Sequence, residues 1–70
     1  MNYIEFMDTI QERHFKYIVA EYDPEVFLVL RSWSNPEDES TWDVVRIDSY
    51  GNFTVNNRDV NMYDWLLGMH

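Results

Sequence analysis

The chain contains no cysteine, so neither a disulfide framework nor a thiolate zinc site can compensate for its small size. It has no G-x-x-x-x-G-K phosphate-binding motif, and it offers no cysteine nucleophile. Its histidines are His14, at a predicted helix–strand junction, and His70, at the last position, and the sequence places no catalytic companion beside either. We therefore expect a protein that is not an enzyme and that uses no cofactor and no metal ion.

Basic residues are also scarce. Five lysines and arginines stand against thirteen aspartates and glutamates, which gives a formal net charge of −8 at pH 7. Direct binding of nucleic acid requires cations that displace counterions from phosphate, and an anionic membrane repels a chain of this charge. The charge thus argues against nucleic acid and membranes as direct partners, and it favours a basic protein.

Long hydrophobic runs are missing from the start of the chain. The first ten residues, MNYIEFMDTI, have no basic segment and are interrupted by Glu5 and Asp8. Signal peptides and membrane spans have a different pattern, so we expect neither, and we expect a cytoplasmic protein.

Aromatic side chains, by contrast, are abundant. They make up 17% of the 70 residues, and each large ring buries on the order of 150–250 Å². A chain of this length buries only about 60% of the surface that its unfolded form exposes, so these rings have to supply much of the core. The composition is typical of a folded protein, and we expect one compact domain over residues 1–70.

Helical periodicity marks the N-terminal segment. Apolar residues spaced by three and four predict an amphipathic helix over residues 2–13. Asn2 is its predicted cap, and Glu5 completes a capping box. The predicted apolar stripe consists of Tyr3, Phe6, Met7 and Ile10.

The apolar period then changes to two, which is typical of β-strands. Asp23 and Pro24 form the first predicted turn, and Gly51 supplies the positive φ that the third turn needs. The four predicted strands lie within residues 15–22, 26–33, 41–48 and 53–55.

The segment from residue 56 to residue 70 returns to a helical period, with Asn57 or Asp59 as its cap and Gly68 as its C-terminal stop. The element order is therefore α-β-β-β-β-α. We expect an α+β fold in which a four-stranded antiparallel meander is packed with an N-terminal and a C-terminal helix.

Two groups of acidic residues follow from this topology, because the first and third turns of a meander lie at one end of the sheet and the second at the other. One end is expected to carry Glu21, Asp23, Glu25 and Asp48. The opposite end is expected to carry Glu37, Asp38, Glu39 and Asp43. Arg31 and Arg46 fall within strands, where they can pair with neighbours such as Asp43 or Asp48.

The second acidic group lies in the window SNPEDESTWD, residues 34–43. This window lacks the glycine and the alternating oxygen ligands of a calcium loop, so we expect no calcium site. Two interpretations remain open for both groups. They are either ordinary solvated surface or a charge pattern that is recognised by a basic partner.

Aromatic residues beside the acidic groups are candidate anchors for a partner, because tryptophan and tyrosine are enriched at binding hot spots. Tyr22 and Tyr50 lie near the first group, and Trp42 leads out of the second. Trp42 can alternatively form a cross-strand pair with Trp33. Trp65, on the C-terminal helix, is expected in the core.

In size, acidic charge and α+β meander order, the chain resembles small phage-encoded inhibitors of bacterial defence, namely the anti-CRISPR and anti-restriction proteins that mimic DNA. These inhibitors share no common motif, so the resemblance assigns no residue. It implies stoichiometric inhibition, in a bacterial cytoplasm, of a nucleic-acid-handling complex such as a CRISPR effector. The acidic residues would occupy the basic groove of that complex.

A second hypothesis comes from the aromatic content. The protein can be a structural or assembly subunit that forms a homo-oligomer through its aromatic surface. The sequence therefore leaves two states open, a monomer that binds a basic partner and a small homo-oligomer.

Overall fold

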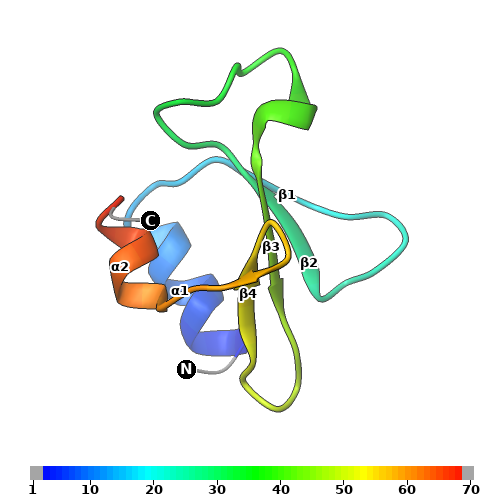
Figure 1. Cartoon of the computed structure of the whole chain (residues 1–70), viewed down its shortest axis with the longest axis vertical. Helices are drawn as coiled ribbons and strands as arrows, with labels where there is room; N and C mark the ends of the chain where they lie inside the picture. The colour runs from blue at the N-terminus through cyan, green and yellow to red at the C-terminus, as the bar shows by residue number, and fades with distance from the viewer. Residues whose placement is uncertain (1–2, 69–70) are drawn as a thin grey trace.

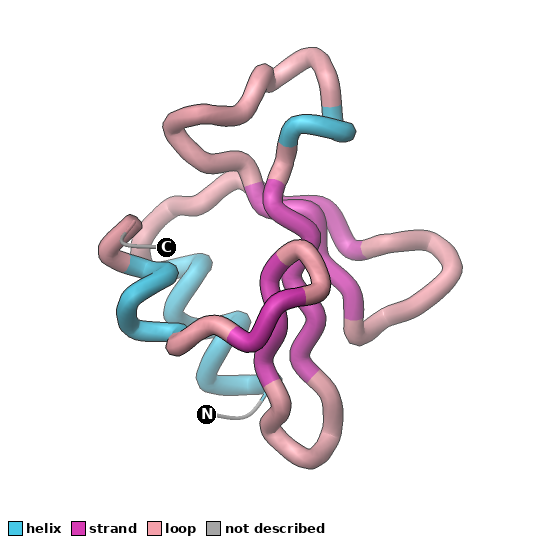
Figure 2. Tube along the Cα trace, viewed as in Figure 1, coloured by secondary structure: helices cyan, strands magenta, loops and turns pink. Residues whose placement is uncertain are grey.

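The computed structural model describes residues 3–68 and shows two α-helices and one antiparallel sheet (Figure 1; Figure 2). The elements in chain order are α1 (Tyr3–Glu12), β1 (Tyr17–Val19), β2 (Val26–Val29), the 3₁₀ turn η1 (Glu39–Thr41), β3 (Asp43–Ile47), β4 (Phe53–Val55), β5 (Arg58–Asp59) and α2 (Met62–Leu66). The strands lie in the order β1-β2-β3-β4-β5, each beside its neighbour in sequence. The predicted α+β meander is confirmed, but the predicted strand number of four is wrong.

The fifth strand arises at a tight turn that the sequence analysis assigned to a helix. Asn56 and Asn57 have φ angles of 53° and 66° and connect β4 to β5. Asparagine tolerates this left-handed conformation, and two consecutive residues of positive φ suit a two-residue hairpin. The predicted helix start at Asn57 or Asp59 is therefore wrong. Asn61 caps α2 instead, and its side chain accepts hydrogen bonds from the first turn.

Helix α1 follows the predicted amphipathic pattern. Phe6 and Ile10 are fully buried, and Met7 is half-buried against the core. The predicted cap, Asn2, lies outside the described residues, as does the side chain of Tyr3.

The end of α1 is closed by a Schellman motif centred on His14. The N–H of Phe15 donates to the carbonyl of Ile10 (3.0 Å), and the N–H of His14 donates to the carbonyl of Gln11 (3.1 Å). His14 has a φ of 57°, at the position where glycine is usually found. Its place at the helix–strand junction thus has a local structural reason. Gly68 ends α2 in the same region of φ, at 77°, as predicted.

Both helices pack on one face of the sheet (Figure 1). The ring of Phe6 on α1 lies 5.4 Å from the ring of Phe27 on β2, and the ring of Trp65 on α2 lies 5.7 Å from that of Phe53 on β4. The strand register places Phe27 and Phe53 on the same face, because they pair with alternate residues of β3, Val45 and Ile47. The opposite face carries no helix among the described residues.

Trp65 joins α2 to the sheet through its side chain and its backbone. Its indole Nε1 donates to the Asp43 carboxylate (2.8 Å), and its carbonyl accepts from Nη2 of Arg31 (2.8 Å). The Arg31 guanidinium also stacks over the rings of Trp65 and Phe15, at 4.6 and 4.8 Å from their centroids. Burial lowers the pKa of Arg31, and the Asp43 charge opposes that shift. Trp65 is fully buried, as predicted.

The Asp43–Trp65 contact should carry a measurable part of the stability. Asp43→Ala leaves the indole N–H buried without its acceptor, which costs roughly 1–3 kcal/mol. We expect urea denaturation at neutral pH to show this loss, whereas Asp59→Ala, an exposed aspartate on β5, should change stability by less than about 0.5 kcal/mol. Similar losses in the two variants would contradict the role given to this contact.

The left-handed residue at the end of α1 gives a second prediction. His14→Gly removes the Cβ strain of positive φ, which is worth roughly 1–2 kcal/mol, at the expense of added freedom in the unfolded chain. We expect the unfolding midpoint to rise in His14→Gly and to stay nearly unchanged in His14→Ala, which keeps the Cβ. Equal midpoints for both variants would show that the imidazole, and not the backbone, decides the effect.

Candidate functional site

The long loop between β2 and β3 is held in place by its own polar groups. The Oδ1 of Asn35 accepts from the N–H of Glu37 (3.0 Å), and its carbonyl accepts from Nε1 of Trp42 (2.8 Å). The N–H of Asn35 donates to the hydroxyl of Thr41 (2.7 Å). The exposed carboxylates of Glu37 and Glu39 are therefore attached to an ordered backbone.

Asp38, between them, has a structural task of its own. Its carboxylate caps η1 by accepting from the backbone N–H of Ser40 (3.1 Å) and from the Ser40 hydroxyl (2.6 Å). The hydroxyl, and then the N–H, lower the pKa of Asp38 below its ordinary value. Asp38 therefore stays ionised at neutral pH while it fixes the loop.

Two acidic residues of the other predicted group organise turns. Asp48 accepts from the side-chain Nδ2 (2.9 Å) and the N–H (3.0 Å) of Asn52 and from the N–H of Tyr50 (2.9 Å). These bonds lower the pKa of Asp48, with the Asn52 side chain as the largest cause. Gly51, which lies between Tyr50 and Asn52 in this turn, has a φ of 84°, as predicted.

Asp23 organises the first turn in the same way. Its Oδ1 accepts from the N–H of Glu25 (3.0 Å), and its Oδ2 forms an ion pair with Arg46 (2.9 Å). The Glu25 N–H is the largest cause of the lowered pKa of Asp23, and Arg46 contributes to it. The ion-pair partner of Arg46 is thus Asp23, which was not among the predicted examples, whereas the predicted neighbour Asp43 acts through its charge on Arg31.

Two predicted partner-binding residues are buried. Asp43 is only 3% exposed and bonds to Trp65 and to Nδ2 of Asn56 (3.2 Å), so its carboxylate faces the core. Trp42 is only 4% exposed and anchors the loop.

The predicted Trp33–Trp42 strand pair is wrong, because Trp33 lies in a loop turn with its half-exposed ring 5.2 Å from the Arg31 guanidinium. Alternation along β3 could have indicated the inward position of Asp43, since it shares a face with Val45.

Other predicted residues do lie at the surface. Tyr22 and Tyr50 are 83% and 90% exposed, and Glu21 is exposed beside Tyr22. Glu25 is half-buried, and its carbonyl accepts from the N–H of Ile47 (3.1 Å). The first turn is therefore tied to the end of β3.

The structure brings one residue from each acidic group together at a hollow beside β1 and β2. Glu21, from the first group, and Glu39, from the second, line one hollow of about 290 Å³. The rest of its lining is mostly apolar and comes from β1, β2 and the first turn: Ile18, Val19, Ala20, Tyr22 and Leu28. Topology alone places these glutamates at opposite ends of the sheet, but the long β2–β3 loop reaches the hollow. We name Glu21, Glu37, Asp38 and Glu39 the acidic face.

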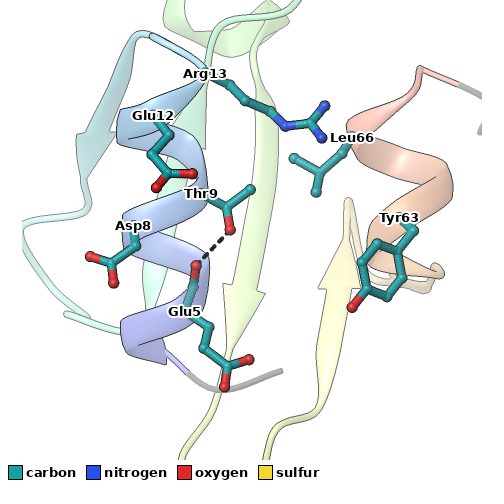
Figure 3. Close-up of a pocket in the computed structure, with 7 residues that line it drawn as sticks. All are labelled: Glu5, Asp8, Thr9, Glu12, Arg13, Tyr63 and Leu66. Atoms are coloured by element: carbon teal, nitrogen blue, oxygen red, sulfur yellow. Dashed lines mark hydrogen bonds between the residues drawn. The ribbon is translucent and has the colours of Figure 1, made fainter.

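A second acidic surface was missed by the sequence analysis. Glu5, Asp8 and Glu12 of α1 line a groove of about 450 Å³, with Tyr63 of α2 on its other side (Figure 3). Thr9 and Arg13 of α1 and Leu66 of α2 complete the lining. The spacing of three and four places these carboxylates on one helix face, which was a signal available in the sequence.

Among residues 3–68, no group of three or more histidine, aspartate or glutamate side chains could hold a metal ion. No helix in this range is long and apolar enough to cross a membrane.

No protein-family model, no curated protein and no solved structure matches the chain.

The carboxylates with lowered pKa predict an acid-labile fold. Asp23, Asp38 and Asp48 bind protons more weakly when folded, so their stabilisation is complete above their unfolded value near 3.8 and is lost as pH falls through the lower folded values. We expect the thermal midpoint to drop below about pH 4. Asp48→Asn, which cannot titrate, should flatten this drop when thermal unfolding is followed by circular dichroism.

The matched control is Asp59→Asn, an exposed aspartate outside these turns. It should leave the acid slope as in the unmodified protein. Equal slopes for Asp48→Asn and the unmodified protein would exclude Asp48 as a source of the acid lability.

Proposed function

We propose that the protein binds another protein and that its acidic face occupies a basic groove which otherwise holds nucleic acid. The observation that carries this proposal is that one residue of each predicted acidic group, Glu21 of the first and Glu39 of the second, lines the same hollow. Glu21 and Glu39 bring negative charge to this hollow, and Glu37 and Asp38 lie on the same loop as Glu39. Grooves rich in lysine and arginine respond to negative charge, as they do to the charge of a phosphate backbone.

The charge balance of the surface supports this function. Nine of the thirteen acidic residues are exposed. Two of the five basic residues are engaged within the fold, Arg31 with Trp65 and Arg46 with Asp23. Little positive charge therefore remains to offset the carboxylates, and a basic partner would be attracted over distances of about a Debye length, roughly 10 Å at moderate salt.

The rigidity of the acidic face supports it as well. The loop that carries Glu37 and Glu39 is fixed by Asn35, Thr41 and Trp42, so less conformational entropy is lost on binding. Tyr22, exposed next to Glu21, offers an aromatic ring at the rim of the same surface. A rigid acidic body of this kind blocks a groove stoichiometrically. A nucleic-acid-handling defence complex such as a CRISPR effector is the partner that the resemblance to phage-encoded inhibitors favours.

Competition with DNA tests this function. The protein is immobilised, exposed to bacterial lysate at low salt, and eluted with a short DNA duplex. We expect the duplex to release nucleic-acid-binding proteins, and we expect salt of about 0.5 M to release the same proteins, because both compete for one charged groove. Retained proteins that the duplex does not release would contradict mimicry of nucleic acid.

Two double variants locate the contact. Glu37→Gln with Glu39→Gln removes two charges from the acidic face and leaves the Asp38 cap in place. Asp8→Asn with Glu12→Gln removes two charges from the α1 groove. We expect the first pair to reduce DNA-displaceable capture by at least about tenfold and the second to reduce it little. Equal losses would mean that only net charge matters, and no acidic face would then be needed.

A further inference from the structure

The hollow that Glu21 and Glu39 line runs along the outer edge of β1. Strand β1 is the first strand of the sheet and pairs only with β2 among the described strands. Successive residues of a strand point to opposite faces, yet Ile18, Val19 and Ala20 all line the hollow. A hollow that touches three consecutive residues runs along the strand edge as well as over one face.

The backbone of this edge is available for pairing. The N–H of Ala20 donates to the carbonyl of Val26 (2.9 Å), and the N–H of Leu30 donates to the carbonyl of Lys16 (2.9 Å). Hydrogen bonds alternate along an antiparallel ladder, so even-numbered residues of β1 bond to β2. The N–H and C=O groups of Tyr17 and Val19 therefore point to the outer edge.

The side chains around this edge are apolar with an acidic rim. Ile18 pairs with Leu28, and Leu28 pairs with Val44, so these three residues form an apolar row across the face opposite to the helices. Ile18 is 37% exposed, and Val44 is 38% exposed. Glu21 and Glu39 also line this hollow, so the surface combines apolar contact with negative charge.

We propose that this edge binds an extended segment of a partner protein, which adds a strand to β1 and in which apolar residues alternate with lysine or arginine. The apolar residues would cover Ile18 and Leu28, and the basic residues would meet Glu21 and Glu39. The choice of a basic segment rests on the acidic face of the proposed function, whereas the binding mode rests on the β1 edge. A second copy of this chain is a poorer occupant, because each copy carries a net charge of −8.

Defined peptides provide the probe. A fluorescein-labelled peptide of about seven residues that alternates lysine with valine is titrated with the protein and followed by fluorescence anisotropy. Two further peptides alternate lysine with serine and glutamate with valine. We expect the lysine–valine peptide to bind at least about tenfold more tightly than either of the others. Equal binding of the lysine–serine peptide would overturn the proposal, because it would show charge attraction without strand addition.

Matched variants on the protein separate the edge from its surroundings. Ile18→Thr and Val44→Thr change residues of nearly equal exposure on the same sheet face, but only Ile18 lines the hollow. Likewise, Glu39 lines the hollow and Glu37 does not. We expect Ile18→Thr and Glu39→Gln each to weaken peptide binding about three- to tenfold, and Val44→Thr and Glu37→Gln to leave it within about twofold. Equal effects within either pair would overturn the proposal.

Val19→Pro tests the backbone directly, because it removes an outward N–H while the ladder to β2 keeps its bonds. Circular dichroism checks its fold, and we expect at least about tenfold weaker binding in a folded variant. Unchanged peptide binding would overturn strand addition, and so would a dimer in sedimentation, since a second copy would then occupy the edge. These outcomes are separable from those of the proposed function, since DNA-displaceable capture depends on both Glu37 and Glu39, whereas peptide binding depends on Glu39 and not on Glu37.

Discussion

The hydrogen bond from the Trp65 indole to the Asp43 carboxylate (2.8 Å) is the contact on which the arrangement of this small protein depends. It joins the short helix α2 to the central strand of the sheet, and Arg31 completes the attachment from the loop after β2. A five-residue helix has too few internal bonds to persist alone. Its position therefore comes from a buried tryptophan that is bonded at both its side chain and its backbone.

This attachment holds α2 on the face of the sheet where α1 also packs (Figure 1). The rings of Phe6, Phe27, Phe53 and Trp65 fill the space between the layers, and the chain has too little material to cover the second face. The row of Ile18, Leu28 and Val44 and the edge of β1 consequently remain accessible. The open face is thus a direct result of building a core from a short chain on one side only.

The acidic residues divide by role. Asp43 serves the core, and Asp23, Asp38 and Asp48 fix turns by accepting backbone hydrogen bonds. The exposed glutamates Glu21, Glu37 and Glu39 have no such local role among residues 3–68. Aspartate is short enough to bond to its own turn, whereas glutamate extends into solvent, which explains why Asp23, Asp38 and Asp48 fix turns while their glutamate neighbours do not.

The sequence by itself determined the local features, because they depend on neighbouring residues. The periodicity of Phe6 and Ile10 gave α1, Gly51 and Gly68 marked the left-handed positions, and the order of elements gave the meander. Tertiary structure alone decided the rest. The hydrogen-bond partner of the Asp43 carboxylate is Trp65, 22 residues away, and whether Asn57 capped a helix or turned a hairpin depended on the pairing of β5 with β4. The convergence of Glu21 and Glu39 likewise required the course of a long loop, which no local propensity specifies.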